Sequence, residues 1–441
     1  MNEVPQRQLG LGFVGLGQAV NLILRRKTEL AQLPYRVVAA AEREERRGAL
    51  TMFQEEFGGR AYTSVAELCA DPDVDVLYIA TLPEQRLEHV TLAAQAGKHV
   101  IVEKPMASTL ADAEKMIEVA DACGIKLMAG HTHSFDPPIL RLQELVESGE
   151  LGALVSVMTF NYNDFNARPW PNRELVSSHG PVLNQGPHQV DIVRQVAGGL
   201  VHSVRASVIW DELRGVEAGY NCFLTFRDGA TALLAFDARG FFDSGELFGH
   251  IGEGGQQRAV GRSIRMRQNF LDLKASSRDD DDLDARLDAQ KEQGRYGTPD
   301  ADGETMALFG YTGGPSLYQP YFGYTLVSCE QGVVRQSPHG LMVYGSRGAE
   351  EITIEKGATG RTAELTEMYE AVVQDRPLFH DGRWGMATLE VCLAILKSAG
   401  TGSEIFMERQ VPARSSLAFH PTGDDAEPVL AATGNHHKEQ S

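Results

Sequence analysis

The chain has 441 residues, which is too long for one ordinary core, so we expect two domains with appended segments. Its formal net charge of -19 and pI near 5.1 argue against a nucleic-acid surface, which requires clustered Lys and Arg. The five cysteines lack any C-x-x-C spacing, the first residues lack a signal pattern, and no run of about 18 apolar residues occurs, so we expect a cytoplasmic protein that does not enter membranes.

Short apolar runs alternate with helical patterns between Leu9 and about Gly130. The runs are LGFVGLG, YRVVAAAE, DVLYIAT, HVIVEKP and IKLMAGH. Strands that alternate with helices imply βαβ units and a parallel sheet. The pattern therefore predicts a dinucleotide-binding domain over residues 1–130, with a doubly wound Rossmann sheet.

The first run leads into Gly15 and Gly17, followed by Gln18. The G-x-G spacing lets the main chain approach a pyrophosphate at the start of a helix. Val20 replaces the third glycine of G-x-G-x-x-G, which serves mainly close packing of helix and strand. Glycine pairs also mark ordinary turns, so it is the position between strand and helix that favours a cofactor loop.

Glu42 ends the second apolar run, where an acidic side chain accepts hydrogen bonds from the adenosine ribose. Its charge would repel a 2′-phosphate, so we expect NAD as the cofactor. Arg43 could instead stack on adenine or contact a phosphate, which leaves NADP open. Glu42 could also be a plain surface residue of a charged helix.

The run VIVEKP, residues 100–105, ends an apolar strand in a carboxylate, an amine and a proline. Pro105 cannot donate to a sheet, so the strand stops near Lys104 and leaves the amine at the carboxyl end, where ligands bind. A partly desolvated lysine has a lowered pKa and can exchange a proton with a hydroxyl, while Glu103 could orient it or set its charge. The simpler alternative is a salt bridge at the strand end.

Longer strand-like runs follow Gly130, among them LVSVMTFNYN, YNCFLTF and TALLAFDARG. They predict a C-terminal α/β domain, 131–414, with an open, mostly antiparallel sheet for substrate binding and oligomerisation. Residues 271–302 form a charged stretch that is too polar to order by itself; a solvated insertion is expected, with a lid as the alternative. The tail, 415–441, is expected to be disordered.

His131 and His133 alternate in GHTHSFDPP, where the two domains should join, so both should lie on one face. Two histidines could begin a metal site, but no third ligand follows at a suitable spacing, and we expect no metal. Contact with substrate is the favoured role, and ordinary hydrogen-bonded histidines are the alternative.

Three motifs together resemble the Gfo/Idh/MocA family of NAD(P)-dependent oxidoreductases: GFVGLG, TLPEQRLEHVTLAAQAGKHVIVEKP and GPVLNQGPHQVDIVRQVAGG. The resemblance implies a dehydrogenase in which Lys104 lies beside the nicotinamide and His188 is the catalytic or substrate-binding imidazole. One of these two groups would be the general base, and the other would orient the hydroxyl. Thr81, Pro83 and His89 join the predicted cofactor contacts.

The third motif departs from the family pattern at Asn184, where many relatives have Asp. An amide cannot take up a proton, but it can hydrogen-bond a diol hydroxyl. Asp191 lies one helical turn beyond His188 and could contact substrate or face solvent.

The segment from Tyr321 to Gly345 and the run THSFDPP resemble the family's phthalate-type cis-dihydrodiol dehydrogenases. The resemblance implies oxidation of a carboxylated aromatic cis-dihydrodiol to a catechol. A dianionic substrate would need cationic partners, for which Arg168, Arg173 and Arg335 are the candidates.

Two other functions remain open from the sequence. A sugar or cyclic polyol dehydrogenase would keep Lys104 and His188 but surround the substrate with hydrogen-bonding groups. A non-enzymatic NAD-binding sensor would not need the lysine. In each case the partner is a small molecule, with no nucleic acid or membrane, and the resemblance implies a homodimer or homotetramer.

Overall fold

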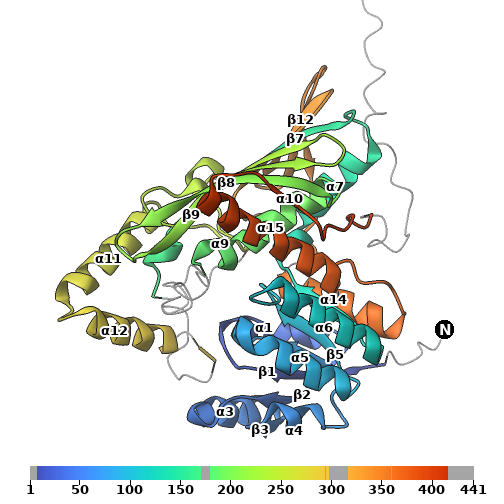
Figure 1. The fold of residues 1–441 in the computed structure, drawn as a ribbon, viewed down its shortest axis with the longest axis vertical. Coiled ribbons are helices and arrows are strands. Elements are labelled where there is room, and N and C mark those ends of the chain that lie inside the picture. The colour runs from blue at the N-terminus through green and yellow to red at the C-terminus, as the bar shows by residue number, and fades with distance from the viewer. Residues whose placement is uncertain (1–6, 170–178, 294, 297–315, 359, 416–441) are drawn as a thin grey trace, which may run out of the picture.

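The computed structural model describes residues 7–169, 179–293, 295–296, 316–358 and 360–415. Two sheets dominate it, one at each end of the molecule (Figure 1). The first is a six-stranded parallel sheet and the second is a larger, mostly antiparallel sheet, as the sequence predicts. None of the described helices is long and apolar enough to cross a membrane.

The six-stranded sheet has the order β3-β2-β1-β4-β5-β6, which places its first strand centrally, and every pairing is parallel. The central strands are buried along their whole length because helices cover both faces. The strands are β1 (Leu9–Val14), β2 (Tyr35–Ala41), β3 (Arg60–Tyr62), β4 (Val76–Ile79), β5 (His99–Glu103) and β6 (Leu127–Gly130).

The helices of this half follow from the spacing of their apolar residues. In α3, Ala49, Leu50 and Phe53 form one buried stripe. α6 begins at the cap Thr109, whose side chain accepts from Asp112, and ends at Gly124 in the left-handed region. The helices are α1 (Gln18–Leu24), α2 (Lys27–Gln32), α3 (Arg47–Phe57), α4 (Val65–Cys69), α5 (Arg86–Gln95) and α6 (Leu110–Cys123), with the short turns η1 (Glu44–Arg46) and η2 (Pro83–Gln85).

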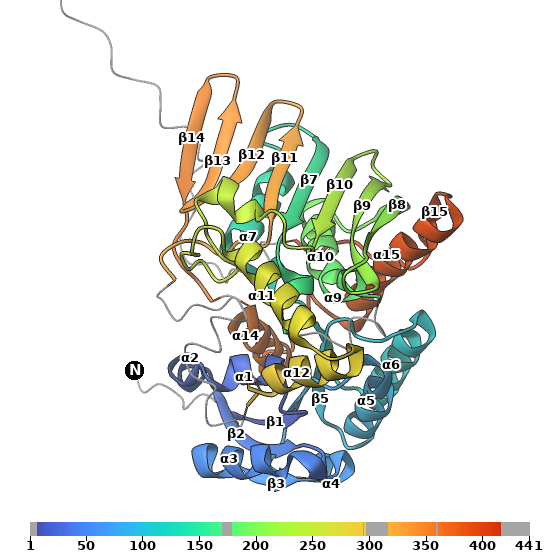
Figure 2. The ribbon, with the colours of Figure 1, turned by 90° about the vertical axis from the view of Figure 1, so that its left-hand side faces the viewer.

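The second sheet has nine strands in the order β14-β13-β12-β11-β7-β10-β9-β8-β15 and is antiparallel except where β10 pairs with β7 (Figure 2). Alternation along the strands buries one face and leaves the other open. The strands are β7 (Leu154–Tyr162), β8 (Val201–Asp211), β9 (Val216–Phe226), β10 (Thr231–Asp237), β11 (Tyr324–Cys329), β12 (Gly332–Ser337), β13 (Gly340–Gly345), β14 (Gly348–Thr353) and β15 (Ile405–Phe406).

Helices on the buried face join this sheet to the first one. α15 packs against β8 on one side and against α6 on the other, so one hydrophobic core spans both halves. These helices are α7 (Pro137–Ser148), α9 (Pro181–Asn184), α10 (Gly186–Val196) and α15 (Gly382–Thr401), with the turns η3 (His133–Phe135), η4 (Phe165–Ala167) and η5 (Ser244–Phe248). α14 (Gly360–Val373) returns to the first sheet, where Leu365, Met368 and Tyr369 join its core.

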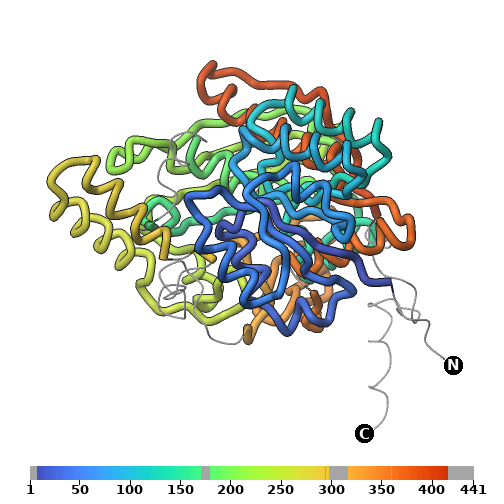
Figure 3. The backbone as a smooth tube through the Cα atoms, turned by 90° about the horizontal axis from the view of Figure 1, so that it is seen from below, coloured from blue at the N-terminus to red at the C-terminus, as the bar shows by residue number. Residues whose placement is uncertain are grey.

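The charged stretch, predicted to be too polar to order by itself, contains two helices in the part that the structure describes, which corrects the prediction that it would not order. α11 (Arg262–Ser276) and α12 (Asp280–Gln293) form an arm that runs from the second sheet down to the first (Figures 2 and 3). Leu283 and Leu287, one turn apart, are buried against Met266 and Phe270, and this small core orders the charged helices. The predicted tail from 416 onward lies outside the described residues.

Candidate active site

The loop after β1 has the shape that a dinucleotide requires. Gly15 has a φ of +86°, and a Cβ there would approach the Ala80 carbonyl oxygen to 3.3 Å, so a side chain would be strained. At Gly17 nothing lies within 4 Å of the position that a Cβ would take, which leaves the main chain open to a ligand. The pyrophosphate-binding turn predicted from the sequence is therefore present in form.

Gln18, the first residue of α1, supports the same reading. Its side-chain oxygen and nitrogen are both buried, and neither has a hydrogen-bond partner among the residues that the structure describes. Buried polar atoms are normally paired, because an unmet one costs about 1–3 kcal/mol. The residues of this loop therefore fit a bound NAD, whose diphosphate would supply the missing partner.

Glu42 closes one side of the loop. Its carboxylate accepts hydrogen bonds from the main-chain N–H groups of Leu16 and Arg43, both at 2.9 Å, and forms an ion pair with Arg46. The Glu42 side chain is only 8% exposed, whereas that of Arg43 is 68% exposed. The Glu42 carboxylate is thus fixed at the loop. Arg46, which the sequence did not single out, partly offsets the charge of Glu42.

The remaining cofactor candidates follow β4. The hydroxyl of Thr81 lies 3.0 Å from Nδ1 of His89, and burial lowers the pKa of this histidine. Arg86, which the sequence did not single out, is buried and donates to the carbonyl oxygens of Thr81, Glu103 and Pro105. It thereby ties the ends of β4 and β5 together. The three predicted residues at this edge are Thr81, Pro83 and His89.

Lys104 lies at the carboxyl end of β5, and its peptide bond to Pro105 is cis. Its Nζ donates to the main-chain carbonyl oxygen of Asn184 at 2.7 Å. Burial lowers the pKa of Lys104 to about 8; the charge of Glu103 opposes this shift and that of Arg361 adds to it. The amine is therefore held in place by the main chain, and its lowered pKa lets it gain and lose a proton near neutral pH.

Glu103 does not hydrogen-bond Lys104 and acts on it through charge. Its carboxylate accepts from Tyr78 at 2.8 Å and pairs with Arg361 of α14. The same Tyr78 oxygen lies 3.0 Å from Glu364, whose pKa burial raises to about 7. A hydroxyl has one hydrogen, so only one carboxylate can receive it, and Glu364, whose pKa is raised, is the one that more readily carries its own proton.

His188 comes to the same place from the first turn of α10. Its ring lies 4.9 Å from that of His133 in an edge-on arrangement, and Phe322 stacks on His133 at 4.5 Å. Burial and the charge of Lys104 lower the pKa of His188 well below its ordinary value, so the imidazole is neutral. Phe322, distant in sequence, supplies an apolar wall beside the two imidazoles.

His131 and Asp191 form a buried pair behind His188. Nδ1 of His131 lies 3.9 Å from a carboxylate oxygen of Asp191, whose other oxygen accepts from Trp384. Burial lowers the pKa of His131 to about 4. No group of three or more His, Cys, Asp or Glu side chains in the described part of the chain could hold a metal ion.

A buried relay that the sequence did not reveal adjoins this pair. Nε2 of His380 lies 2.8 Å from the hydroxyl of Ser134, and its Nδ1 lies 2.8 Å from Glu367. Burial opposes protonation, but Glu367 holds the pKa of His380 above its ordinary value. The only sequence signal was the histidine itself in LFHDGR, far from every motif.

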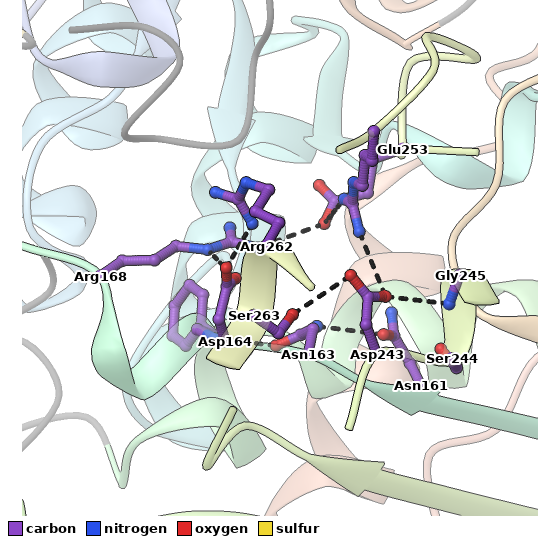
Figure 4. A network of polar contacts seen from close by, with 12 residues as sticks. Asn161, Asn163, Asp164, Arg168, Asp243, Ser244, Gly245, Glu253, Arg262 and Ser263 are labelled. Atoms are coloured by element: carbon purple, nitrogen blue, oxygen red, sulfur yellow. Dashed lines mark hydrogen bonds and ion pairs between the residues drawn. The ribbon is translucent and has the colours of Figure 1, made fainter. Parts of the chain in front are cut away.

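The predicted arginines have different fates. Arg168 is buried and pairs with Asp164 at 2.8 Å and with Glu253 at 3.8 Å (Figure 4). Arg335 lies on the open face of the second sheet, where its Nε donates to the Tyr344 hydroxyl, so the structure does not bring it to the site. Arg173 lies outside the described residues.

The structure thus gathers Lys104, His131, His133, His188 and Asp191 at the junction of the two sheets. Asn184 joins them through its main-chain oxygen, while its side chain accepts from Gln185. These groups suit proton exchange with a hydroxyl beside a dinucleotide loop.

Comparison with known proteins identifies the family. Residues 9–131 match the family model described as the oxidoreductase family with an NAD-binding Rossmann fold, and residues 139–249 match the GFO/IDH/MocA C-terminal domain. A solved protein of Bordetella bronchiseptica RB50 superposes with a TM-score of 0.79 and 29% identity, covering 91% of this chain and all of that one.

Relatives with assigned activities agree. The chain is 32% identical to the 1-carboxy-3-chloro-3,4-dihydroxycyclohexa-1,5-diene dehydrogenase of Comamonas testosteroni, over 88% of this chain and 94% of that protein. It is 30% identical to the myo-inositol 2-dehydrogenase of Thermotoga maritima, over 55% of this chain and 72% of that protein. The resemblance read from the motifs is confirmed: the chain belongs to the GFO/IDH/MocA family of oxidoreductases and is an NAD(P)-dependent dehydrogenase.

Proposed function

We propose that this dehydrogenase oxidises a carboxylated aromatic cis-dihydrodiol to a catechol with NAD⁺. The observation that carries the chemistry is Lys104, whose amine, with a pKa of about 8, is held by the Asn184 carbonyl next to a neutral His188. The dehydrogenase from Comamonas testosteroni, which by its name acts on such a carboxylated diol, supports the substrate class.

The cofactor would be held along one edge of the first sheet. Gly15, Gly17 and Gln18 would bind the diphosphate, and Glu42 and Arg43 would face the adenosine ribose. The residues at the ends of β4 and β5 would line the nicotinamide half; they are Thr81, Pro83, His89, Glu103 and Lys104. Bound NAD⁺ supplies the acceptor for the hydride.

Lys104, as the free amine, accepts the proton of the hydroxyl whose carbon gives up its hydrogen. His188, which is neutral, hydrogen-bonds the same or the neighbouring hydroxyl and fixes its direction. Loss of the hydroxyl proton and of hydride from the carbon leaves a hydroxyketone. The hydroxyketone then tautomerises: the ring carbon that still carries a hydroxyl loses its proton, the ketone oxygen gains one, and the aromatic catechol results. The gain in aromaticity favours oxidation.

Phe322 fits the ring of such a substrate. It stacks on His133 and lies 5.0 Å from the ring of His188, so a flat or nearly flat carbocycle would find an apolar wall beside its hydroxyls. A polyol with hydroxyls on every carbon would have to bury one of them against this ring, at an unfavourable free energy.

A single assay decides between the substrates. Purified protein with NAD⁺ is offered a carboxylated benzene cis-dihydrodiol, myo-inositol or glucose in separate tubes, and the absorbance of the reduced nicotinamide is followed. Turnover of the dihydrodiol alone supports the proposal. Turnover of only the polyol or the sugar contradicts the substrate, and a protein that binds NAD⁺ but oxidises none of the three contradicts the enzymatic role.

We also propose that residues 131–414 serve substrate binding and self-association, while 1–130 serve the dinucleotide. The open face of the nine-stranded sheet exposes Met158, Phe223 and Leu233 by 40% or more. Such a patch suits a homodimer or homotetramer in the cytoplasm. Sedimentation would show a single monomeric species if this proposal were wrong.

A further inference from the structure

A buried cluster of alternating charges in the second half of the molecule has no part in the chemistry proposed above (Figure 4). It combines three arginines with three carboxylates, all on segments of the second half around α11. All but Glu253 are at least nine-tenths buried. The six residues are Asp164, Arg168, Asp243, Glu253, Arg258 and Arg262.

Asp164 and Asp243, two carboxylates of this cluster, each accept from at least two donors. Asp164 binds Arg168 at 2.8 Å and also pairs with Arg262. Asp243 accepts from the N–H of Gly245 at 2.9 Å and from the hydroxyl of Ser263 at 3.1 Å. These contacts hold the two carboxylates and the arginine side chains in place.

Two of the arginines keep donors unused. Arg258 reaches Asp243 and Glu253 only at 3.6 and 3.5 Å, and its buried Nε has no hydrogen-bond partner among the described residues. Arg262 uses one terminal nitrogen on Asp164, and the other is buried without a partner. Guanidinium groups with unmet N–H donors in a desolvated place are strong binders of a carboxylate.

Glu253 connects this cluster to the catalytic groups. Its charge raises the pKa of Lys104, and the charge of His133 acts in turn on Glu253, so the three lie within electrostatic reach. The main-chain oxygen of Glu253 also accepts from the N–H of Tyr321, the residue before the Phe322 wall. Glu253 therefore joins the cluster to the segment that carries Phe322.

We propose that Arg258 and Arg262 form the subsite for the ring carboxylate of the substrate. This inference rests on the proposed function, whose substrate carries such a group, and it assigns the specificity to two residues that no motif marks. The carboxylate would take the free Nε–H of Arg258 and the free terminal N–H of Arg262, and Glu253 would be left to face a hydroxyl.

Binding to the unmodified protein gives the first test. Calorimetry with NAD⁺ present compares 3,4-dihydroxybenzoate with catechol, which differ only in the carboxylate. A charge-assisted hydrogen bond contributes about 1.5–3 kcal/mol, so the carboxylate should tighten binding by about 10- to 150-fold. Equal binding of the two compounds would overturn the subsite whatever the variants do.

Variants give the second test. Arg258→Gln and Arg262→Gln should remove most of that difference and raise KM for the carboxylated cis-dihydrodiol by about 10-fold or more, while KM for unsubstituted benzene cis-dihydrodiol stays within about 2-fold. Arg265→Gln, exposed on the same helix as Arg262, is the matched control. Arg258→Lys and Arg262→Lys keep the charge if a glutamine variant does not fold, and they should recover only part of the affinity.

The outcomes separate this inference from the proposed function. If wild-type protein oxidises the carboxylated diol and both variants do so with unchanged KM, the subsite is wrong and the function stands. If wild type oxidises neither diol but binds 3,4-dihydroxybenzoate through these arginines, the subsite stands and the function falls. An equal loss on both diols in the variants contradicts a carboxylate-specific role.

Discussion

The Nζ atom of Lys104 lies 2.7 Å from the main-chain oxygen of Asn184, so the amine at the end of β5 is aimed by the turn that precedes α10. A main-chain acceptor holds the ammonium without neutralising it. The proposed base therefore stays free to lose its proton, and its position depends on the two halves of the molecule remaining docked.

Replacing Lys104 by Ala should lower kcat by about 100- to 10,000-fold, because a general base is removed. NAD⁺ binding, measured by fluorescence titration, should persist because the glycine loop is untouched. Lys115→Ala, a surface change on α6 with the side chain 60% exposed, should leave both quantities unchanged. Near-normal turnover in Lys104→Ala would contradict the catalytic assignment.

The rate of oxidation should rise with pH through about 8, the pKa of Lys104, because the amine must be unprotonated to accept a proton. Glu103 raises this pKa by its charge, so Glu103→Gln should move the rise in kcat/KM to lower pH. Glu118→Gln, on an exposed position of α6, should not move it. A profile that stays in place or moves to higher pH in Glu103→Gln would show that another group titrates.

Wild-type protein should prefer NAD over NADP because Glu42 would meet the 2′-phosphate. Glu42→Ser should lower that preference, measured as the ratio of kcat/KM for the two cofactors. The change also releases Arg46 and the N–H of Leu16, which could then bind the phosphate. An unchanged ratio would mean that Glu42 serves only to hold the loop.

Stability should fall as the pH drops from about 6.5 towards 4, since folding keeps His131 neutral with a pKa of about 4. In this pH range His131 is protonated in the unfolded chain but not in the folded one. The difference lowers the free energy of unfolding by about 2 kcal/mol at pH 5. His380 offsets part of this fall between pH 7 and about 6.5, because its raised pKa gives its full stabilisation only below the unfolded pKa; at lower pH its contribution stays constant. Urea unfolding at pH 7 and 5 should show a smaller loss in His131→Asn than in wild type.

The arm of α11 and α12 should matter for the cofactor half. Tyr296, just after the arm, donates to Glu56 at 2.6 Å, and Glu292 lies 3.8 Å from Arg46 beside Glu42. Leu287→Ala should destabilise the arm by about 2–5 kcal/mol and weaken NAD⁺ binding. Asp281→Ala, exposed on the same helix, is the control. Unchanged hydrogen exchange in the arm and unchanged NAD⁺ affinity in Leu287→Ala would show that the arm does not support the cofactor half.

The sequence reveals features that depend on neighbours along the chain. The five apolar runs predict five of the six strands of the first sheet, because a strand that is buried on both faces has a continuous apolar sequence. Lys104 and His188 were found through motifs whose residues are contiguous. Arg335 was misplaced: in the structure Val334 and Gln336 of β12 are buried, so Arg335 between them lies on the other face of the sheet, and the run GVVRQS has no alternation that would have shown this.

Residues that reach the site from distant segments could not be found in this way. Arg361 and His380 stand in segments without a motif, and only the packing of α14 and the second sheet against the first brings them to Lys104 and His131. Phe322 lies in the segment from Tyr321 to Gly345, but the resemblance of that segment did not single it out. The sequence also did not reveal that the charged arm is ordered. Two leucines among acidic residues form a core only because Phe270 lies opposite them in the structure.

The position of α14 has a consequence for engineering. Its Arg361 donates to the Ala19 carbonyl in the first turn of α1, and the Tyr35 hydroxyl donates to the Leu365 carbonyl at 2.9 Å. Met368 joins the apolar core around β1. A fragment cut near residue 130 would expose that core and leave Glu103 buried without its guanidinium. The dinucleotide half is therefore not a portable module, and a chimera that exchanges it between relatives would have to carry residues 360–373 with it.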